Sequence, residues 1–374
     1  MEKERILWLD SVKGISCWAV FFGHFVFCYG FLPFIHRWVS EDKVTSFTCN
    51  GNAAMDVFII ISAFIEASVF LNIEEKFRSK AGTGIVKRYF RFAIPVFMIE
   101  LVVFLLQKSG LWTDRFPAIP VRDIPFSEIL YDSFYLTLFK GSSNVYPVFW
   151  MINVMFIGYM LVLLLCAILS VVNRVTGYIL LSVLLIFTMV QLNMFFLVFF
   201  GVFLYLLYRD IYDKGVEKKT GSLRIVRYVA GALFIILSIY MAGRDNQLAE
   251  LMTVKGLPEF TRMAYFICWI AAAFLMAGLV LCTPAVKLLS NRKLAAMGKI
   301  CFPMFLLHPL CLVTFGEYAY RFFDARAGEF NHGTKAAFFA SFVSMVILSV
   351  LYAKFMEPLI NKLTNKIIGV VARK

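Results

Sequence analysis

The sequence predicts an all-α integral membrane protein, a bundle of about ten transmembrane helices with its N-terminus in the cytoplasm. Two observations carry this prediction. The 374 residues are 61% hydrophobic and only 16% charged, and they include 41 Phe, a composition far from the soluble average. Apolar runs of roughly 20 residues also recur along the whole length, which argues against a soluble enzyme with a large apolar core.

The expected spans are the apolar windows that lie between charged breaks. The first run is long, carries Lys13 and His24, and lacks a small-residue cleavage pattern, so we expect it to remain as a helix rather than be removed as a signal peptide. One transmembrane domain is expected over residues 1–356, followed by a basic amphipathic cytoplasmic tail over 357–374. The spans are predicted near residues 12–34, 53–73, 90–108, 145–170, 175–191, 193–209, 226–243, 262–282, 298–316 and 335–356.

The basic residues indicate topology rather than a nucleic-acid partner. With a cytoplasmic N-terminus, the inside loops collect 25 of the 37 Lys and Arg, as the positive-inside rule requires. The net charge of +13 therefore reflects alternate loops and not one basic stripe. The eight cysteines contain no CxxC pair and are interpreted as core packing, so neither a disulfide framework nor a metal site is expected.

Ionisable residues inside spans are the candidate functional residues, because a charge at the bilayer centre costs about 3 kcal/mol or more. Lys13 and His24 are eleven residues apart, which places them within about 20° of the same helix face and about 16 Å apart along the axis. Both can line one inward-facing stripe. Lys13 alone could equally be a snorkelling anchor at the cytoplasmic edge.

Several polar side chains share one predicted depth. Counting about 1.5 Å per residue from the helix ends places His24, Glu100 and His308 near the midplane, with Glu66 somewhat closer to the cytoplasm. Imidazole beside carboxylate in a low-dielectric cavity suits general-base chemistry or proton relay. A polar knot that only holds helices together is the structural alternative.

Arg88 and Arg91 are one helical turn apart at the predicted cytoplasmic start of the third span, before Pro95. Two guanidiniums on one face offer bidentate recognition of phosphate, as in the pyrophosphate of a coenzyme that enters from the cytosol. A positive-inside anchor is the alternative. Weaker candidates for the lining of a cavity are Asp56, Trp150 and Asn153.

The long segment between residues 108 and 145 is predicted to lie outside. It contains three prolines and an aromatic patch from Phe126 to Phe139. This composition predicts an ordered interfacial element that caps a cavity.

The motifs resemble those of acyltransferase family 3, a group of multi-spanning membrane enzymes that acylate glycans and other acceptors. The stretch 9–15 (LDSVKGI) is similar to the family opening, and the spacing from Lys13 to His24 is the most specific match. Residues 55–58 (MDVF) and 62–64 (SAF) look like the family's second span. Arg88, Arg91 and the following Pro95 look like its basic motif.

The resemblance continues to the C-terminal end. Residues 298–309 (GKICFPMFLLHP) are similar to the ninth-span signature, and Glu357-Pro358 to the closing motif. The sequence departs from the family pattern in three places: Ala63 replaces the usual glycine, Lys13 stands where arginine is commoner, and Met155 stands where many members have glutamate.

The resemblance implies an acyltransferase that transfers groups other than amino-acyl groups. It implies an acyl-CoA co-substrate, most simply acetyl-CoA, held by Arg88 and Arg91, with His24 central to transfer and Lys13 ordering the donor or the helix end. His24 would act as a general base or as a transient acyl carrier. The expected acceptor is a hydroxyl of a cell-envelope glycan or glycolipid at the plasma (inner) membrane.

Membrane lipids and envelope biosynthesis proteins are the other expected partners. A transporter or flippase for a glycan precursor, with His24, Glu66 and Glu100 as a proton path, is the alternative. The sequence shows no internal repeat of the kind common in secondary transporters, and a transporter does not need paired arginines for a coenzyme.

Overall fold

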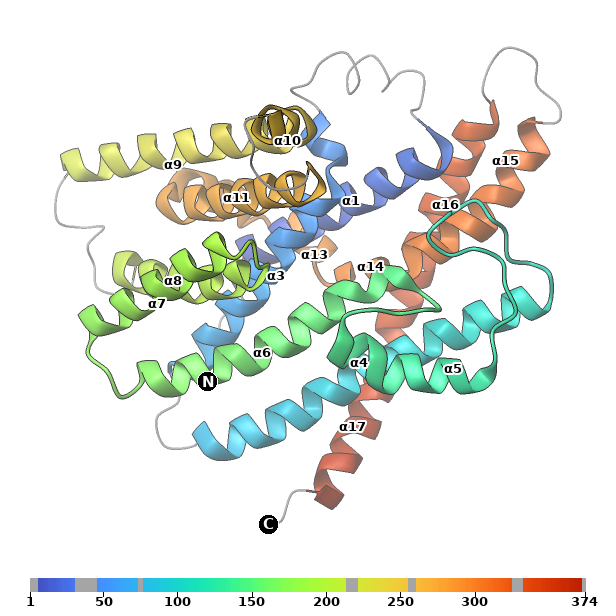
Figure 1. Ribbon diagram of the computed structural model, residues 1–374, viewed down its shortest axis with the longest axis horizontal. Coiled ribbons are helices and arrows are strands. Elements are labelled where there is room, and N and C mark those ends of the chain that lie inside the picture. Colours follow the sequence, from blue (N-terminus) through green and yellow to red (C-terminus); the bar gives the residue numbers. More distant parts are fainter. Residues whose placement is uncertain are drawn as a thin grey trace. The chain divides into compact units, whose positions relative to one another are not determined.

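The computed structural model of the protein describes residues 6–30, 46–72, 77–212, 221–254, 260–324 and 332–371. The described residues form helices and no strand (Figure 1). They divide into two compact units. Unit 1 comprises Met1–Val20, Trp38–Phe77 and Gly158–Gly298, and unit 2 comprises Phe21–Arg37, Arg78–Ile157 and Lys299–Lys374.

Two long helices contribute to both units. They are α1 (Leu7–Tyr29) and α6 (Trp150–Leu169). The other elements of unit 1 are η2 (Ser46–Cys49), α3 (Gly51–Phe70), α7 (Arg174–Val190), α8 (Phe195–Tyr212), α9 (Gly221–Ala242), α10 (Asp245–Val254), α11 (Phe260–Leu281), α12 (Thr283–Leu289) and α13 (Arg292–Met297). Unit 2 contains α4 (Phe77–Lys108, from its second residue), α5 (Phe126–Tyr131), η3 (Asp132–Lys140), η4 (Pro147–Phe149), α14 (Cys301–Cys311), η6 (Leu312–Gly316), α15 (Glu317–Asp324), α16 (His332–Leu351), η7 (Tyr352–Met356) and α17 (Glu357–Val371).

The helical membrane fold is confirmed. Within the described ranges, nine helical stretches are long and apolar enough to cross a membrane, and the 17-residue α7 is a shorter apolar helix at the position of the remaining predicted span. Two predicted starts were wrong: α1 begins at Leu7 rather than near residue 12, and α4 begins at Phe77 rather than near residue 90. The cytoplasmic N-terminus stays a prediction.

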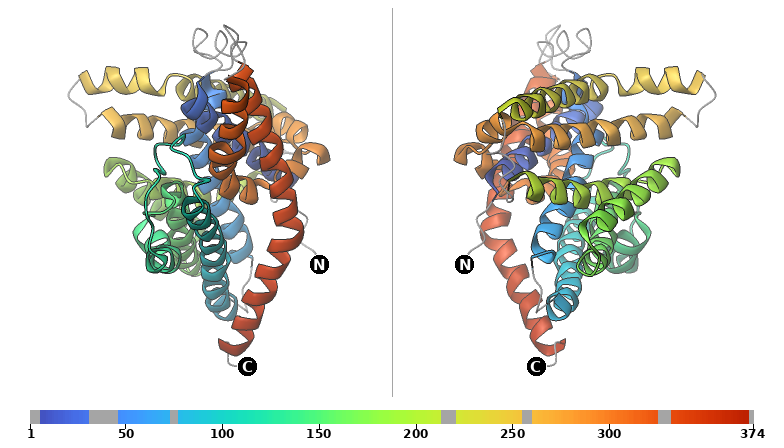
Figure 2. Two further views of the ribbon diagram at one scale, coloured as in Figure 1. Left: turned by 90° about the vertical axis from the view of Figure 1, so that its right-hand side faces the viewer. Right: turned by 90° about the vertical axis from the view of Figure 1, so that its left-hand side faces the viewer.

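Glycines allow close helix packing in unit 1. A Cβ atom added to Gly231 on α9 would lie 2.8 Å from the carbonyl oxygen of Gly278 on α11, and one added to Gly278 would lie 2.7 Å from the carbonyl oxygen of Gly231. The two helices therefore touch backbone to backbone, and Figure 2 shows them side by side. Lipid offers no hydrophobic drive for helix association, so such close van der Waals contact between small residues is what holds α9 to its neighbour.

Unit 2 uses π-helical turns to present backbone carbonyls. In η6, the hydroxyl of Tyr29 donates to the Leu312 oxygen at 2.6 Å, and the hydroxyl of Thr113 donates to the Val313 oxygen at 2.7 Å. A π-turn shifts the backbone hydrogen bonds to an i+5 spacing, and the Leu312 oxygen accepts both the Glu317 N–H and the Tyr29 hydroxyl. The end of α1 and the segment after α4 are thereby attached to the same turn.

The C-terminal helices α16, η7 and α17 follow one another without a break and form one long rod (Figure 2). The continuous helix that includes a membrane-length apolar window extends from His332 to Val370, and its last element, α17, begins at Glu357, the first residue of the predicted tail. The basic cytoplasmic tail stays a prediction. The segment expected to cap a cavity also forms helices: α5 and η3 cover its aromatic patch.

Replacing Gly201 tests the contact between α8 and α3. A Cβ atom there would lie 2.5 Å from the Ile60 carbonyl oxygen and 2.7 Å from Ala63 Cβ. We expect Gly201→Ala to destabilise the protein by about 1–3 kcal/mol, because the two helices must separate to admit the methyl group. Thermal unfolding of the detergent-solubilised protein measures the change.

Gly82→Ala is the matched control, since a Cβ atom there meets no heavy atom within 4 Å. Alanine is the better helix former by about 0.5–1 kcal/mol, so this variant should melt no lower than the wild type. A Gly201→Ala protein as stable as the control would show that the two helices are not in close contact.

Candidate functional site

Two histidines from distant parts of the chain meet in unit 2. His24 Nδ1 on α1 lies 2.6 Å from His308 Nε2 on α14. The two rings are nearly parallel, with an interplanar angle of 5° and centroids 4.9 Å apart. His308 is 1% exposed, whereas His24 is partly exposed. Two of the three residues that were predicted to lie at one depth, His24 and His308, are therefore in direct contact.

The partners of His308 determine which ring nitrogens carry hydrogen. His308 Nδ1 lies 2.9 Å from the Phe305 carbonyl oxygen and 3.2 Å from that of Met304. A carbonyl oxygen can only accept, so Nδ1 must carry the hydrogen, and Nε2 of the neutral ring is then an acceptor. His24 Nδ1–H therefore donates to His308 Nε2. The remaining nitrogen, His24 Nε2, has a lone pair that is free to accept a proton.

Pro309 explains why the Phe305 carbonyl is available to a side chain. In an α-helix this oxygen would accept the N–H of the residue four positions later. That residue is Pro309, inside α14, and proline has no N–H. The carbonyl is left to the His308 ring, so the His308-Pro309 dipeptide both places the imidazole and supplies its orienting acceptor.

A loop segment lies against His24. The ring of Phe116 is edge-on to the His24 ring, at 5.3 Å and 87°, and is 2% exposed. Its neighbour Arg115 forms an ion pair with the buried Glu317 and lies over the ring of Tyr320 at 4.5 Å. Burial lowers the pKa of Arg115, but the contacts with Glu317 outweigh it and raise that pKa overall. This ion pair holds the segment in place beside His24.

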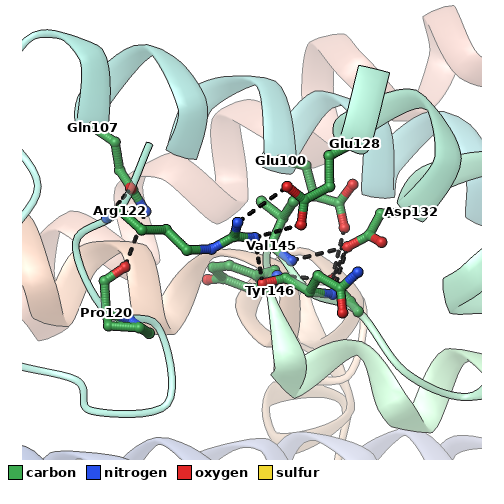
Figure 3. Close-up of polar contacts among 10 residues, drawn as sticks. Glu100, Gln107, Pro120, Arg122, Glu128, Asp132, Val145 and Tyr146 are labelled. Atoms are coloured by element: carbon green, nitrogen blue, oxygen red, sulfur yellow. Dashed lines mark hydrogen bonds and ion pairs between the residues drawn. The ribbon is translucent and has the colours of Figure 1, made fainter. Parts of the chain in front are cut away.

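Glu100 lies in a second polar cluster of unit 2, shown in Figure 3. Its side chain is 0% exposed. The Ser133 hydroxyl donates to Glu100 Oε2 at 2.6 Å, and the Ser143 Oγ lies 3.0 Å from Glu100 Oε1. The same Ser143 Oγ lies 3.0 Å from Asp132 Oδ2 and accepts the backbone N–H of Tyr146. Glu100 is thereby attached to the segment that follows α5.

Hydrogen counting in this cluster favours a protonated Glu100. Ser143 has a single hydroxyl hydrogen but lies between two carboxyl groups. Asp132 Oδ2 also accepts the backbone N–H groups of Asn144 and Val145, so Asp132 is the better-supported anion, although burial still raises its pKa. If Ser143 donates to Asp132, a proton on Glu100 Oε1 completes the contact with Ser143.

Tyr146 connects this cluster with the turn that carries His308. Its backbone N–H donates to Ser143 Oγ, and its hydroxyl lies 3.2 Å from both the Leu306 carbonyl and the Leu310 N–H. Glu100 and the histidine pair are therefore linked through one buried tyrosine.

Arg88 and Arg91 lie inside α4 rather than at its first turn. The Arg88 guanidinium lies over the ring of Phe92, 5.0 Å from its centroid. Arg91 is exposed, and it interacts electrostatically with Arg88 and with Glu357. Arg91 in α4 and Glu357, the first residue of α17, are therefore close enough to interact electrostatically.

Three expected site residues lie in unit 1. Lys13 Nζ forms an ion pair with Asp10 at 2.6 Å. Asp56 is 3% exposed, and its Oδ2 has no hydrogen-bond partner among the described residues. Glu66 accepts a hydrogen bond from Ser62 at 3.0 Å, one turn away on α3. These three residues belong to unit 1, whereas the two histidines belong to unit 2.

The other two candidates lie at the start of α6. Asn153 donates to the Leu138 carbonyl at 2.7 Å and thereby holds the end of η3. A Cβ atom on Gly141, which has φ 71°, would lie 3.0 Å from Asn153 Oδ1. Trp150 is the first residue of α6 and is partly buried.

Sequence reasoning missed Ser133, Ser143, Tyr146, Phe116 and Arg115. The first two and the last two lie between the predicted spans, where depth counting does not apply, and Tyr146 lies at the very start of the predicted span 145–170. The proline-rich and aromatic composition of the segment was the available signal, but it indicated order rather than these contacts. In the part of the chain that is described, no group of three or more His, Cys, Asp or Glu side chains could hold a metal ion.

Substitutions at Glu100 test the protonated state. We expect Glu100→Gln to keep nearly the wild-type melting temperature, because the amide can donate to Ser143 and accept from Ser133. Glu100→Ala should cost about 1–3 kcal/mol, since it leaves both buried hydroxyls with an unfilled partner. Thermal unfolding in detergent compares the two variants. If both substitutions lower the melting temperature equally, Glu100 is needed as an anion.

Comparison with known families places the chain. A sequence model of acyltransferase family 3, described as an acyltransferase domain, matches residues 6–354, nearly the whole chain. No curated protein and no solved structure matches this chain. Ala63 on α3 replaces the glycine usual in the family, and its Cβ faces Gly201 on α8. The glycine that allows the two helices to approach closely is therefore on α8 here. The chain belongs to acyltransferase family 3 and is a multi-pass membrane protein.

Proposed function

We propose that this protein transfers an acyl group, most simply acetyl, from cytosolic acyl-CoA to a hydroxyl of a cell-envelope glycan or glycolipid at the plasma (inner) membrane. The observation that carries the proposal is the contact between His24 and His308, in a chain that belongs to an acyltransferase family. It leaves the lone pair of His24 Nε2 available for chemistry inside a membrane-spanning bundle.

In the simplest route, His24 Nε2 accepts the proton of the acceptor hydroxyl while the hydroxyl oxygen attacks the thioester carbonyl. The C–S bond then breaks, and the proton held by His24 passes to the leaving thiolate. Throughout, His24 Nδ1–H remains bonded to His308 Nε2, which stabilises the imidazolium as it forms. In the other route, Nε2 itself carries the acyl group briefly before transfer.

The donor site that we propose includes Arg88 and Arg91. Guanidinium groups on consecutive turns suit the phosphates of coenzyme A, and the exposed Arg91 is accessible to a soluble donor. Glu357 near Arg91 would orient the guanidinium without removing its remaining N–H donors. Lys13 would order the donor, and Glu100 is a further candidate site residue on the acceptor side.

The first experiment replaces His24. Membranes that contain the protein should release CoA and incorporate labelled acyl groups into envelope glycans, and His24→Ala should lower both by about 10²-fold or more because the proton acceptor is lost. His332→Ala, at the exposed first residue of α16, is the control for a histidine substitution. Full activity in His24→Ala would remove the assignment of the base, and the mass of the added group identifies the acyl donor.

Variants at residues 308 and 309 test the orientation of His24. His308→Gln keeps an acceptor for His24 Nδ1–H and should retain more activity than His308→Leu, which we expect to lower kcat about 10²-fold with little change in the KM for acyl-CoA. Pro309→Ala restores an N–H that competes for the Phe305 carbonyl, so kcat should fall while the protein remains folded. Unchanged kcat and pH–rate profiles in all three variants would exclude a positioning role.

The arginine pair is tested by donor kinetics. Arg91→Gln should raise the KM for acyl-CoA about tenfold or more and leave kcat nearly unchanged, because a phosphate contact is made equally in the ground and transition states. Lys87→Gln, four residues earlier on α4, is the matched control for a lost positive charge. A fall in kcat at constant KM would place Arg91 in the chemical step instead.

A further inference from the structure

Unit 1 contains a cavity of about 420 Å³ where several helices of the bundle end. It is lined from the ends of α3, α6 and α8 and from the starts of α4 and α7. None of the site residues discussed above lines it. Because these are helix ends, the cavity lies at the edge of the membrane, where lipid headgroups are found.

Part of the cavity lining is basic. Arg174 Nη2 forms an ion pair with Asp210 Oδ2 at 2.5 Å, and Tyr178 also donates to that oxygen. The Arg174 side chain is 53% exposed and lines the cavity, so part of its guanidinium is accessible to a ligand. Arg209 also lines the cavity, and its Nε is buried without a hydrogen-bond partner among the described residues. A buried guanidinium N–H that lacks a partner is costly, which indicates that an acceptor completes it.

The helix start adds further donors to the same part of the lining. Asn173 caps α7 by accepting the Thr176 N–H at 2.9 Å, and it lines the cavity next to Arg174. The first N–H groups of the 17-residue α7 lack partners within the helix and carry a partial positive charge. Two guanidiniums and this helix start together favour an anion with several oxygen atoms.

The rest of the cavity lining is mainly apolar. The side chains of this apolar wall are Phe70, Leu71, Phe77, Leu169, Val172 and Leu206. A free inorganic anion would leave this wall facing water. A ligand that carries an anionic group beside a hydrocarbon chain would cover both parts of the lining at once.

We propose that this cavity binds a membrane phospholipid through its phosphate ester, with the phosphate on Arg209 and Arg174 and one acyl chain against the apolar wall. The chemistry recognised is a phosphate ester next to an apolar chain. An anionic lipid is favoured because the described lining contains two arginines and no acidic residue, and the neighbouring Asp210 pairs with Arg174. The inference is independent of the acyl-transfer proposal.

The test measures lipid retained by the purified full-length protein. After exchange into detergent with added dioleoylphosphatidylglycerol, native mass spectrometry should show a bound lipid that phosphatidylcholine replaces poorly. Arg209→Gln should weaken retention about tenfold or more, as expected for a charge-assisted hydrogen bond. Arg224→Gln, an exposed arginine at the start of α9, should retain the lipid like the wild type.

A second variant separates lost charge from misfolding. Leu206→Trp fills the cavity and leaves both arginines in place, so it should also lower retention while the melting temperature without lipid stays close to that of the wild type. Coenzyme A is the competing source of the same phosphate chemistry. If it displaces the lipid in an Arg209-dependent manner, the lipid assignment is overturned in favour of the coenzyme. Wild-type retention in both Arg209→Gln and Leu206→Trp would overturn the site itself.

Discussion

The structure depends on the inability of hydrocarbon to form hydrogen bonds. Every polar side chain within a span must find its partner inside the protein, so buried polar contacts are few and closely matched. The pair of His24 and His308 shows how strict this matching is. Three of its four ring nitrogens are bonded to each other or to a carbonyl, and the fourth, His24 Nε2, remains available. The same requirement explains why Glu100 is enclosed by serines.

The sequence predicted the features that follow from regular geometry. Hydropathy located the helices, and the fixed rise per residue placed His24 and His308 at one depth. The contacts of Glu100 did not follow, because Ser133 and Ser143 lie in a segment between spans whose path no periodicity determines. The start of α4 at Phe77 was missed for another reason: residues 77–90 include the basic residues Arg78, Lys80, Lys87 and Arg88, and hydropathy does not detect a helix that extends past the apolar core.

Backbone carbonyls released from regular helices recur around the proposed site. Pro309 frees the Phe305 oxygen for His308, and the π-turn η6 presents the Leu312 and Val313 oxygens to hydroxyl donors. In each case a local break in the helix supplies an acceptor without adding a side chain. At these two places a departure from an ideal helix therefore serves to orient polar groups within an apolar bundle.

The use of a carbonyl in place of a carboxylate has a consequence for solvation. In a triad with an aspartate, the resting enzyme must bury an anion, which is expensive where no water is present. His24, His308 and the Phe305 carbonyl form a chain that is neutral at rest. In the acyl transfer proposed above, positive charge would exist only while His24 holds a proton. This arrangement makes the resting site inexpensive to place in a membrane and confines the cost of ionisation to the short life of the reacting state.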